Sequence, residues 1–302
     1  MSRITVIGSL NMDLVITTPK VPVMGETVLG SGFMTVPGGK GANQAVAAAK
    51  LGGNVTMIGC VGSDTFGEEL LNNLRRNSVD TSHMRMLDGV PTGIAMIVVN
   101  EGNNFIIVDP GANYQLAPQM IDSVEDLIKE SCIMVAQLEI PLDTVERAID
   151  IAKRNDVKVL LNPAPAIKLE DSLLAKVDIL TPNETECEII TGISIKSVED
   201  AKNAVAYLMN KGVENVIVTM GGNGVVYNSG NKIIHKTVPN VKVVDTTAAG
   251  DSFSGALAVA LSQGKTIDEA VDFGNIVGTL TVLKKGAQTS LPTMEDVLKF
   301  DM

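Results

Sequence analysis

Short uninterrupted runs of hydrophobic residues alternate along the chain with longer segments in which hydrophobic residues recur every three or four positions. The first pattern is typical of strands buried on both faces, and the second of helices that cover them. Buried strands are predicted at residues 4–7, 55–61, 132–136, 158–162, 178–180 and 215–219. Helices are predicted at residues 41–51, 66–77, 118–129, 142–155, 184–191, 198–211, 254–261 and 267–283. This alternation predicts an α/β fold of three layers, in which helices cover both faces of a mostly parallel sheet.

Two segments break the alternation, because they are apolar but lack helical periodicity. The first predicts short strands at residues 14–16, 26–30 and 33–36, and the second predicts a hairpin of residues 93–99 and 105–108 around a turn at 100–104. We expect one small β-sheet, a lid of about residues 12–37 and 91–110, on a single α/β domain of residues 1–302. An apolar lid face needs a cover, which predicts a homodimer formed through the lids.

Charge and cysteine content narrow the possible partners. The 302 residues include 35 acidic and 24 basic side chains, for a formal net charge of −11. This balance argues against nucleic acid and anionic membranes as partners. No apolar run approaches the roughly 20 residues that a membrane span needs, and residues 1–8 predict a strand rather than a signal peptide. Three dispersed cysteines without metal-ligand spacing indicate a reducing, cytoplasmic location.

The segment 243–253 combines an apolar pair, a turn of small residues and the start of a helix. Val243 and Val244 predict the end of a buried strand, and the helix is expected to end near Gly264. Because the turn has little side-chain bulk, its N–H groups can approach a ligand at a helix N-terminus, where an anion is favoured. The amides expected to bind a phosphoryl group are those of Ala248, Ala249, Gly250 and Asp251.

Asp251 lies at the mouth of this predicted anion hole, in a turn that also contains Asp245. A carboxylate in that position can accept the proton of an attacking hydroxyl while the turn binds the phosphoryl group. The alternative is that Asp251 only caps the helix. Two acids and two threonines in one turn favour the catalytic interpretation.

A second glycine-rich turn, residues 38–43, precedes the predicted helix at 41–51. It is not a P-loop, because Gly41 follows Lys40 where Ser or Thr is required, and it is not a complete dinucleotide fingerprint. Its glycines allow a small polyol to approach the backbone, and Asn43 can bind hydroxyls as donor and acceptor. The alternative is an ordinary helix start with a solvent-exposed lysine.

Polar side chains follow several predicted strands, where an open parallel sheet binds its ligands. Asn11 and Asp13 are candidate hydroxyl binders after the first strand, with a turn stabilised by their side chains as the alternative. Glu139 follows the strand at 132–136. Residues 181–186 join a strand to a helix and can be explained by capping alone, and the glycine turn at 219–224 also suits a β-hairpin.

Two motifs carry a resemblance to a known family. Residues 245–251, Asp-Thr-Thr-Ala-Ala-Gly-Asp, resemble the C-terminal signature of the ribokinase-like carbohydrate kinases, and residues 38–45, Gly-Gly-Lys-Gly-Ala-Asn-Gln-Ala, resemble their N-terminal signature. The resemblance extends over the whole chain and implies the ribokinase-like fold with its small β-sheet lid. Many members have Gly where this chain has Ala248, but a backbone N–H is present in either case.

The resemblance also implies three groups of site residues. It assigns the sugar site to Asn11, Asp13, Gly39, Lys40, Gly41, Ala42, Asn43, Glu139 and Asp251. It assigns the ATP site to Asn183, Glu186, Thr219, Met220, Gly221, Gly222, Asn223, Gly224, Gly250 and Asn275, with Asn183 and Glu186 near Mg²⁺ and phosphate. It assigns a K⁺ site, formed mainly by backbone atoms, to Asp245, Thr247, Thr281, Lys284, Gly286 and Ser290. Without the resemblance, Asp245 can be read as a turn cap and residues 281–290 as a helix C-terminus.

The resemblance implies an ATP-dependent kinase that phosphorylates D-ribose at the 5-hydroxyl and supplies D-ribose 5-phosphate to ribose catabolism. Kinases of deoxyribose, of a fructose phosphate or of a nucleoside remain alternatives. Lys40 is the only basic residue in the predicted sugar loops, which disfavours a phosphorylated sugar, and these polar loops do not suggest an apolar pocket for a base. A sugar sensor without catalytic activity is a further alternative, which the presence of Asp251 disfavours.

Overall fold

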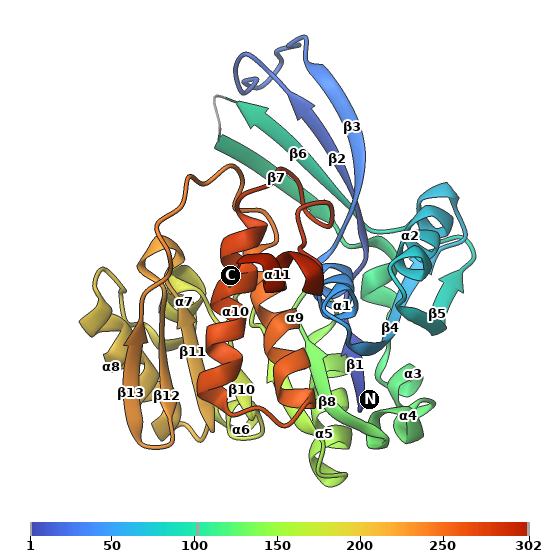
Figure 1. The fold of residues 1–302 in the computed structure, drawn as a ribbon. Coiled ribbons are helices and arrows are strands. Elements are labelled where there is room, and N and C mark those ends of the chain that lie inside the picture. Colours follow the sequence, from blue (N-terminus) through green and yellow to red (C-terminus); the bar gives the residue numbers. More distant parts are fainter. Residues whose placement is uncertain (1, 101–102, 301–302) are drawn as a thin grey trace.

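The computed structural model describes residues 2–100 and 103–300. Within these residues a nine-stranded sheet has the order β13-β12-β11-β10-β9-β8-β1-β4-β5 (Figure 1). Neighbouring strands from β11 to β5 are parallel, and β12 and β13 are added antiparallel. The strands are β1 (Arg3–Ile7), β4 (Asn54–Gly62), β5 (Asp80–Leu87), β8 (Ser131–Ala136), β9 (Lys158–Leu161), β10 (Ile179–Leu180), β11 (Asn215–Thr219), β12 (Val225–Ser229) and β13 (Lys232–Lys236).

Both faces of this sheet are covered, as the apolar strands predict. Along β8, Ile133 and Val135 belong to one hydrophobic core, whereas Met134 and Ala136 belong to the other. Since successive side chains of a strand point to opposite faces, the two cores lie on opposite sides of the sheet. The three-layer α/β architecture with a mostly parallel sheet is therefore confirmed.

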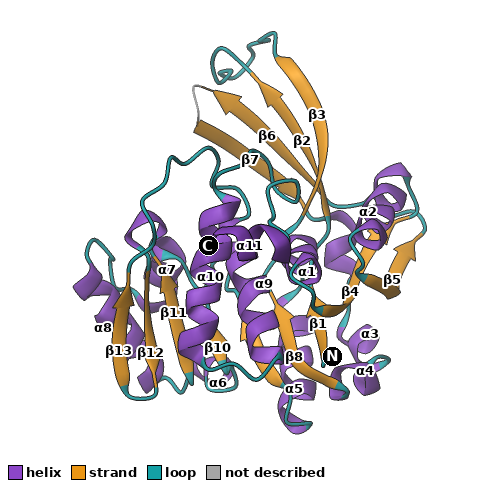
Figure 2. Cartoon of the chain, in the orientation of Figure 1, coloured by secondary structure: helices purple, strands orange, loops and turns teal. Residues whose placement is uncertain are grey.

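The helices divide between the two faces (Figure 2). The core that contains Ile133 and Val135 is closed by α1 (Lys40–Lys50), α2 (Thr65–Arg76), α9 (Ala249–Ser262), α10 (Ile267–Thr281) and α11 (Met294–Phe300). The core that contains Met134 and Ala136 is closed by α3 (Pro118–Asp122), α4 (Glu125–Lys129), α5 (Leu142–Arg154), α6 (Asp171–Leu174), α7 (Glu184–Thr191) and α8 (Val198–Asn210). Two short 3-10 helices, η1 (Gly111–Gln115) and η2 (Gly221–Asn223), complete the described elements. None of the helices in the described ranges is long and apolar enough to cross a membrane.

A separate small sheet projects from one end of the molecule (Figure 1). Its order is β3-β2-β6-β7, with β2 (Asn11–Thr17), β3 (Ser31–Gly38), β6 (Ile94–Asn100) and β7 (Asn103–Asp109). β2 and β6 are parallel, so the sheet combines two segments far apart in the chain, as the sequence predicts. β6 and β7 form the predicted hairpin. The tip of its predicted turn, residues 101–102, lies outside the described residues.

Three predicted elements are wrong. Residues 26–30 lie in the loop between β2 and β3 and form no strand. The predicted helix at 118–129 is divided into α3 and α4, because Val124 has non-helical backbone angles (φ −122°, ψ 20°). Val243 and Val244 do not end a buried strand: they lie in a loop and are 54% and 58% exposed. The apolar pattern alone does not distinguish a buried strand from a loop that presents valines to a pocket.

The pattern of hydrophobic runs did not predict β5, β12 and β13. β5 is an edge strand with an exposed face and is rich in polar residues, so it has no continuous apolar run. β12 and β13 follow the glycine turn at 219–224, for which a hairpin was one of the two interpretations. That turn does lead into a β-hairpin.

Candidate active site

The polar residues that follow the parallel strands gather at the carboxyl end of the sheet. Glu139 follows β8, Asn162 follows β9 and Asn183 follows β10. The first turns of α1 and α9 meet at the same place, because Asn43 of α1 donates a hydrogen bond to Asp251 of α9. Topology thus brings together residues that are up to 208 positions apart, at the edge where such sheets bind ligands.

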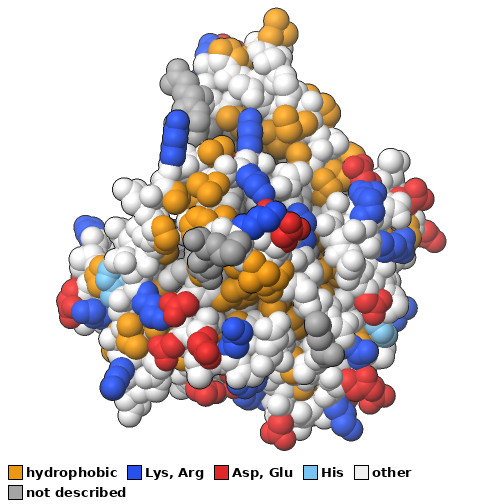
Figure 3. Space-filling view, viewed as in Figure 1, with side chains coloured by type: hydrophobic (Ala, Val, Ile, Leu, Met, Phe, Trp, Pro, Cys, Tyr) orange, Lys and Arg blue, Asp and Glu red, His pale blue; other side chains and the backbone are white. Residues whose placement is uncertain are grey.

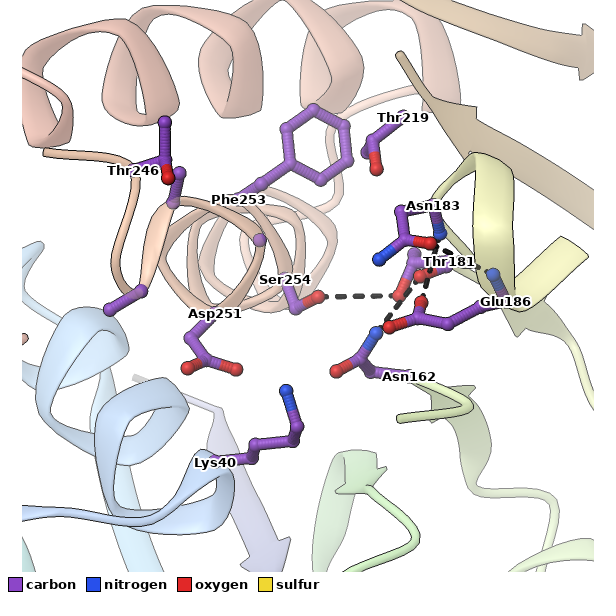
Figure 4. Close-up of a pocket in the computed structure, with 13 residues that line it drawn as sticks. Lys40, Asn162, Thr181, Asn183, Glu186, Thr219, Thr246, Asp251, Phe253 and Ser254 are labelled. Atoms are coloured by element: carbon purple, nitrogen blue, oxygen red, sulfur yellow. Dashed lines mark hydrogen bonds between the residues drawn. The ribbon is translucent and has the colours of Figure 1, made fainter. Parts of the chain in front are cut away.

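A cavity of about 170 Å³ opens between these elements. Figure 4 shows the Lys40 ammonium and the Asp251 carboxylate pointing toward each other from α1 and α9. The opposite wall is held by hydrogen bonds, from Asn162 Nδ2 to the Thr181 carbonyl (2.9 Å) and between the Thr181 and Ser254 hydroxyls (3.2 Å). The remaining lining residues are Asn183, Glu186, Thr219, Thr246, Ala248, Ala249, Gly250 and Phe253.

The small-residue turn forms the N-terminus of α9, as predicted. Ala248 is the N-cap and lies in the left-handed region (φ 61°, ψ 10°), which is uncommon for a residue other than glycine. This tight turn places the backbone of Ala248, Ala249 and Gly250 on the cavity wall. The first N–H groups of a helix have no intrahelical partner, so the wall is suited to an anion. The Ala249 N–H is an exception to the predicted set of amides, because it donates to the Thr246 carbonyl (3.2 Å).

Asp251 is not the cap of α9. It is 7% exposed, and its carboxylate accepts hydrogen bonds from two side chains of α1: Asn43 Nδ2 to Oδ2 (2.9 Å) and Gln44 Nε2 to Oδ1 (3.0 Å). The carboxylate is thus fixed at the cavity beside the anion-binding turn. The capping alternative from the sequence does not describe this side chain.

Lys40 is not an ordinary solvent-exposed lysine. Burial is the largest influence on its pKa and lowers it, but attraction by Asp251, Glu139 and Glu186 outweighs burial and leaves the pKa raised. The ammonium is therefore charged at neutral pH, among three carboxylates. A positive group in this position suits a ligand that brings additional negative charge.

The loops that follow β1 and β8, the second of which contains the predicted sugar residue Glu139, converge on the start of α1. Glu139 Oε2 accepts hydrogen bonds from Ser9 Oγ (2.5 Å) and from the Lys40 N–H (3.0 Å). Gly39, the N-cap of α1, has φ 89°, and a Cβ there would lie 2.8 Å from Leu10 Cα. The glycine thus allows the two loops to pack backbone against backbone.

Asn11 is buried and its amide oxygen accepts a hydrogen bond from Asn113 Nδ2 (2.8 Å). Asn113 also bonds the N–H and the carbonyl of Leu10 through its own oxygen (2.9 Å) and nitrogen (3.0 Å). The sequence analysis missed Asn113, and no local pattern marks it, since it lies in η1 more than 100 positions away from Asn11.

Asp13 has an unusual electrostatic environment. Burial, together with the negative charges of Glu139 and Asp251, raises its pKa from 3.8 to about 7. The effect of Glu139 and Asp251 shows that the three carboxylates lie close enough to interact. Such a cluster of acceptors is suited to a ligand with several hydroxyl donors.

A second, larger pocket of about 630 Å³ adjoins the first and shares Asn183, Thr219, Thr246, Ala249, Gly250 and Phe253 with it. Among its other lining residues are the predicted Gly221, Gly222, Gly224 and Asn275. Val238, Pro239, Val241 and Val243 form an apolar wall that the sequence analysis missed. Val243 is therefore exposed because it faces an open pocket. Met220 and Asn223 do not line it: Met220 is buried in the core, and the Asn223 carbonyl is hydrogen-bonded to His235 (2.8 Å).

Asn183 and Glu186 form a reciprocal capping box at the start of α7. Asn183 Oδ1 accepts from the Glu186 N–H, and Glu186 Oε2 accepts from the Asn183 N–H, both at 2.9 Å. The prediction that these residues cap a helix is confirmed. Both residues also line the first cavity, and burial raises the pKa of Glu186.

The segments around Asp245 and residues 281–290 lie side by side. Asp245 accepts hydrogen bonds from the Thr247 N–H (2.9 Å) and hydroxyl (2.7 Å), and from the Gly286 N–H (2.9 Å). Burial raises the pKa of Asp245, but these hydrogen bonds outweigh burial and leave the pKa lowered. The carboxylate thus caps the turn, as the interpretation from local sequence proposed. It accepts three hydrogen bonds, and a carboxylate has about four acceptor positions, so one position is left for a cation.

Other residues predicted for the cation site have occupied side chains. The Thr281 hydroxyl bonds to Ser252 Oγ (2.9 Å) and the Val277 carbonyl (2.8 Å), and the Ser290 hydroxyl donates to the Ala287 carbonyl (2.7 Å). The Lys284 ammonium lies 3.8 Å from the Asp296 carboxylate. The sequence interpretation assigned mainly backbone atoms of these residues to the cation, and these side-chain contacts leave their backbone carbonyls as the expected ligands.

The chain was compared with known proteins. The sequence model of the pfkB family carbohydrate kinases matches residues 1–294. The ribokinase of Haemophilus influenzae is 44% identical over 299 residues, 98% of this chain and 97% of that protein. The deoxyribokinase of Salmonella typhi is 38% identical over 294 residues, 97% of this chain and 96% of that protein. The structure of Arabidopsis thaliana ribokinase complexed with ribose and ATP is similar with a TM-score of 0.93 and 34% identity, covering 99% of this chain and 98% of that one.

Proposed function

This chain belongs to the pfkB family of carbohydrate kinases, and from that premise we propose that it transfers the γ-phosphoryl group of ATP to the 5-hydroxyl of D-ribose. The observation that carries the proposal is the position of Asp251. Its buried carboxylate is hydrogen-bonded to Asn43 of the predicted sugar loop on one side and adjoins the small-residue turn of α9 on the other. The reaction needs one base between an acceptor hydroxyl and a phosphoryl group, and Asp251 has that position.

In the proposed reaction, Asp251 accepts the proton of the 5-hydroxyl as that oxygen attacks the γ-phosphorus. The bond between the γ-phosphorus and the bridging oxygen breaks, and ADP leaves with the electron pair. The N–H groups of Ala248, Gly250 and Asp251 donate to the transferred phosphoryl group, whose charge develops next to the positive end of α9, whereas the Ala249 N–H is bonded to the Thr246 carbonyl (3.2 Å). The Lys40 ammonium adds a positive charge from α1.

The ribose hydroxyls are proposed to bind Asn11, Asp13, Asn43 and Glu139, at the backbone of residues 39–42. ATP is proposed to extend into the larger pocket, with its phosphates at the shared wall of Thr219 and Gly250 and its base between Asn275 and the valines of the 238–243 loop. This assignment includes Thr219, Gly221, Gly222 and Gly224, which line the larger pocket. It is supported by the continuity of the two pockets.

Mg²⁺ is part of the proposal. It prefers oxygen ligands and is usually held by one or two carboxylates together with substrate phosphates. Glu186 offers a carboxylate and Asn183 an amide at the cavity, so the residues present fit the ion. When bound, Mg²⁺ neutralises charge on the β- and γ-phosphates.

A K⁺ ion is proposed beside Asp245 and Thr247, with backbone carbonyls of Thr281, Lys284, Gly286 and Ser290 as further ligands. The adjacency of the two segments supports this site. The ion would stabilise the turn that leads into α9 without touching substrate.

We further propose that the small sheet acts as a lid over the sugar and pairs with the lid of a second subunit. Its support is the exposure of large hydrophobic side chains of the small sheet, among them Met96, Phe105 and Ile107. Figure 3 shows hydrophobic side chains exposed at the upper end of the molecule, where this sheet lies. A cytoplasmic location completes the proposal, and the free thiols of Cys60, Cys132 and Cys187 suit a reducing compartment.

Deoxyribose is the second candidate substrate, because of the similarity to the Salmonella deoxyribokinase. ADP release from ATP and Mg²⁺ should be compared for D-ribose, 2-deoxy-D-ribose, fructose 6-phosphate and adenosine, with ³¹P NMR of the product. The proposal expects the highest kcat/KM with D-ribose and a 5-phosphate ester. A higher kcat/KM with any of the other three would contradict it.

A further inference from the structure

Two chains of buried amide side chains end on the two oxygens of Asp251. In the first, Asn43 Nδ2 donates to Asp251 Oδ2 (2.9 Å), and Asn43 Oδ1 accepts from Gln288 Nε2 (3.1 Å). Gln288 Oε1 in turn accepts from Asn73 Nδ2 of α2 (2.5 Å). This chain connects the loop after α10, and the surface helix α2, to the carboxylate.

The second chain reaches the other oxygen. Gln44 Nε2 donates to Asp251 Oδ1 (3.0 Å) and to Asn162 Oδ1 (3.0 Å). Gln44 Oε1 accepts from Gln137 Nε2 (2.7 Å), at the end of the central strand β8. Gln44 and Gln137 are fully buried, and Gln288 is 5% exposed.

Buried amides are unfavourable unless they are hydrogen-bonded, so an apolar core would be the simpler way to fill this space. Amide donors that come from fixed elements hold both carboxylate oxygens in one orientation. They are neutral, so they orient the carboxylate without placing a cation at hydrogen-bond distance from it. A carboxylate has about four acceptor positions, so each oxygen can still accept a hydroxyl proton.

We propose that Gln44 and Gln288 are positioning residues that align the base Asp251, Gln44 directly and Gln288 through Asn43. The inference rests on the proposed function, in which Asp251 accepts the proton of the sugar hydroxyl. Gln44 is fully buried and its amide is hydrogen-bonded to Asp251, Asn162 and Gln137, so the proposal gives it no contact with the sugar or ATP. Loss of Gln44 should therefore act on the rate of the chemical step, whereas loss of Gln288 also releases Asn43, which belongs to the proposed sugar site.

The test uses Gln44→Met and Gln288→Met, which keep side-chain length and remove the amide. Misplacement of a catalytic group by about 1 Å can lower the rate roughly 100-fold, and we expect kcat to fall about 10- to 100-fold in each variant. The KM for ATP should stay within about twofold of the wild type in both variants, and the KM for ribose should do so in Gln44→Met, because the lost interaction belongs to the transition state. In an Asp251→Asn background neither substitution should lower the residual rate further, since groups that act as a unit are not additive.

Asn228→Leu is the matched control. Asn228 is a buried amide on β12 with hydrogen bonds to the backbone of Val216, Glu214 and Gly230, distant in the sheet from the site. Its loss should lower the melting temperature and leave kcat unchanged. If Gln44→Met fails to fold, Gln288→Met tests the other oxygen on its own, because Gln288 lies in a loop.

The outcomes separate the two proposals. If Asp251→Asn loses activity and the glutamine variants keep wild-type kcat, the positioning role is overturned and the proposed function stands. The positioning role is also overturned if Asn228→Leu lowers kcat as much as the glutamine variants do, or if their effect persists in the Asp251→Asn background. If the wild type does not phosphorylate ribose, the proposed function itself fails.

Discussion

Gly38 lies against the carboxyl group of Asp13: a Cβ built on Gly38 would be 2.6 Å from Asp13 Cγ. The two residues belong to neighbouring strands of the small sheet, in which Asn11 is paired with Gly38. Asp13 can therefore keep this side-chain position only because position 38 has no side chain. This contact connects the first glycine of the motif at residues 38–43 to the proposed sugar site.

Gly38→Ala is expected to raise the KM for ribose about tenfold, because the methyl group displaces the Asp13 carboxylate. Asp13→Ala should raise it about 10- to 100-fold, the effect of losing a charged hydrogen-bond acceptor. The KM for ATP should not change in either variant. Steady-state kinetics with each substrate varied in turn checks this, and an increase confined to the KM for ATP would place the sugar elsewhere.

The raised pKa of Asp13 predicts a pH-dependent stability. Its pKa is 3.8 ordinarily and about 7 in the folded, ligand-free protein. Between about pH 4 and pH 7 the folded protein holds a proton that the unfolded chain releases, so this group lowers the free energy of unfolding as the pH rises. Asp13→Asn removes that contribution.

The melting temperature of Asp13→Asn minus that of the wild type should therefore be larger at pH 8 than at pH 5. Calorimetry of the substrate-free proteins at both pH values gives this difference. A difference that is equal at the two pH values would mean that Asp13 titrates normally.

Asp251→Asn is expected to lower kcat by about 10² to 10⁴, since loss of a general base alone has that effect. Binding of ribose and ATP should be nearly unchanged, because the amide has the same shape. Rapid-quench kinetics and calorimetric titration measure the two quantities. Retention of more than about a tenth of the wild-type rate would rule Asp251 out as the base.

Activity is expected to depend on K⁺ in addition to Mg²⁺. Rates with K⁺ should exceed those with tetramethylammonium at equal ionic strength, because an ion beside Asp245 would stabilise the turn before α9. Asp245→Ala should lower the rate and abolish the difference between the two salts. Equal rates of the wild type in both salts would leave Asp245 as a turn cap only.

The lid is expected to mediate a dimer. Met96 and Ile107 are paired across β6 and β7, and they are 50% and 55% exposed. Ile107→Glu places a charge in this apolar surface and should give a monomer in sedimentation equilibrium. Leu298→Glu, at an exposed apolar residue of α11 outside the lid, is the control and should remain dimeric. A monomeric wild type would contradict the proposal.

The predictions from sequence were most accurate where local chemistry decides the structure. Continuous apolar strands such as 132–136 predicted a sheet covered on both faces, because the side chains that point to either face are hydrophobic. The motifs at 38–45 and 245–251 located the starts of α1 and α9, where a glycine at φ 89° and a run of small residues are required. The capping box of Asn183 and Glu186 was likewise readable, since its bonds span three residues.

Only the tertiary structure decided what is formed by residues distant in sequence. The partner of Asn11 is Asn113, the oxygens of Asp251 are held from α1, and Gly286 bonds Asp245 across 41 positions. Val243 looked like a strand residue and is a pocket wall. The sequence by itself determined the strands that are buried on both faces and the tight turns before α1 and α9, because these depend on hydrophobicity and backbone freedom. The pairing of buried polar groups depends on which elements the fold places together, so the local sequence does not predict it.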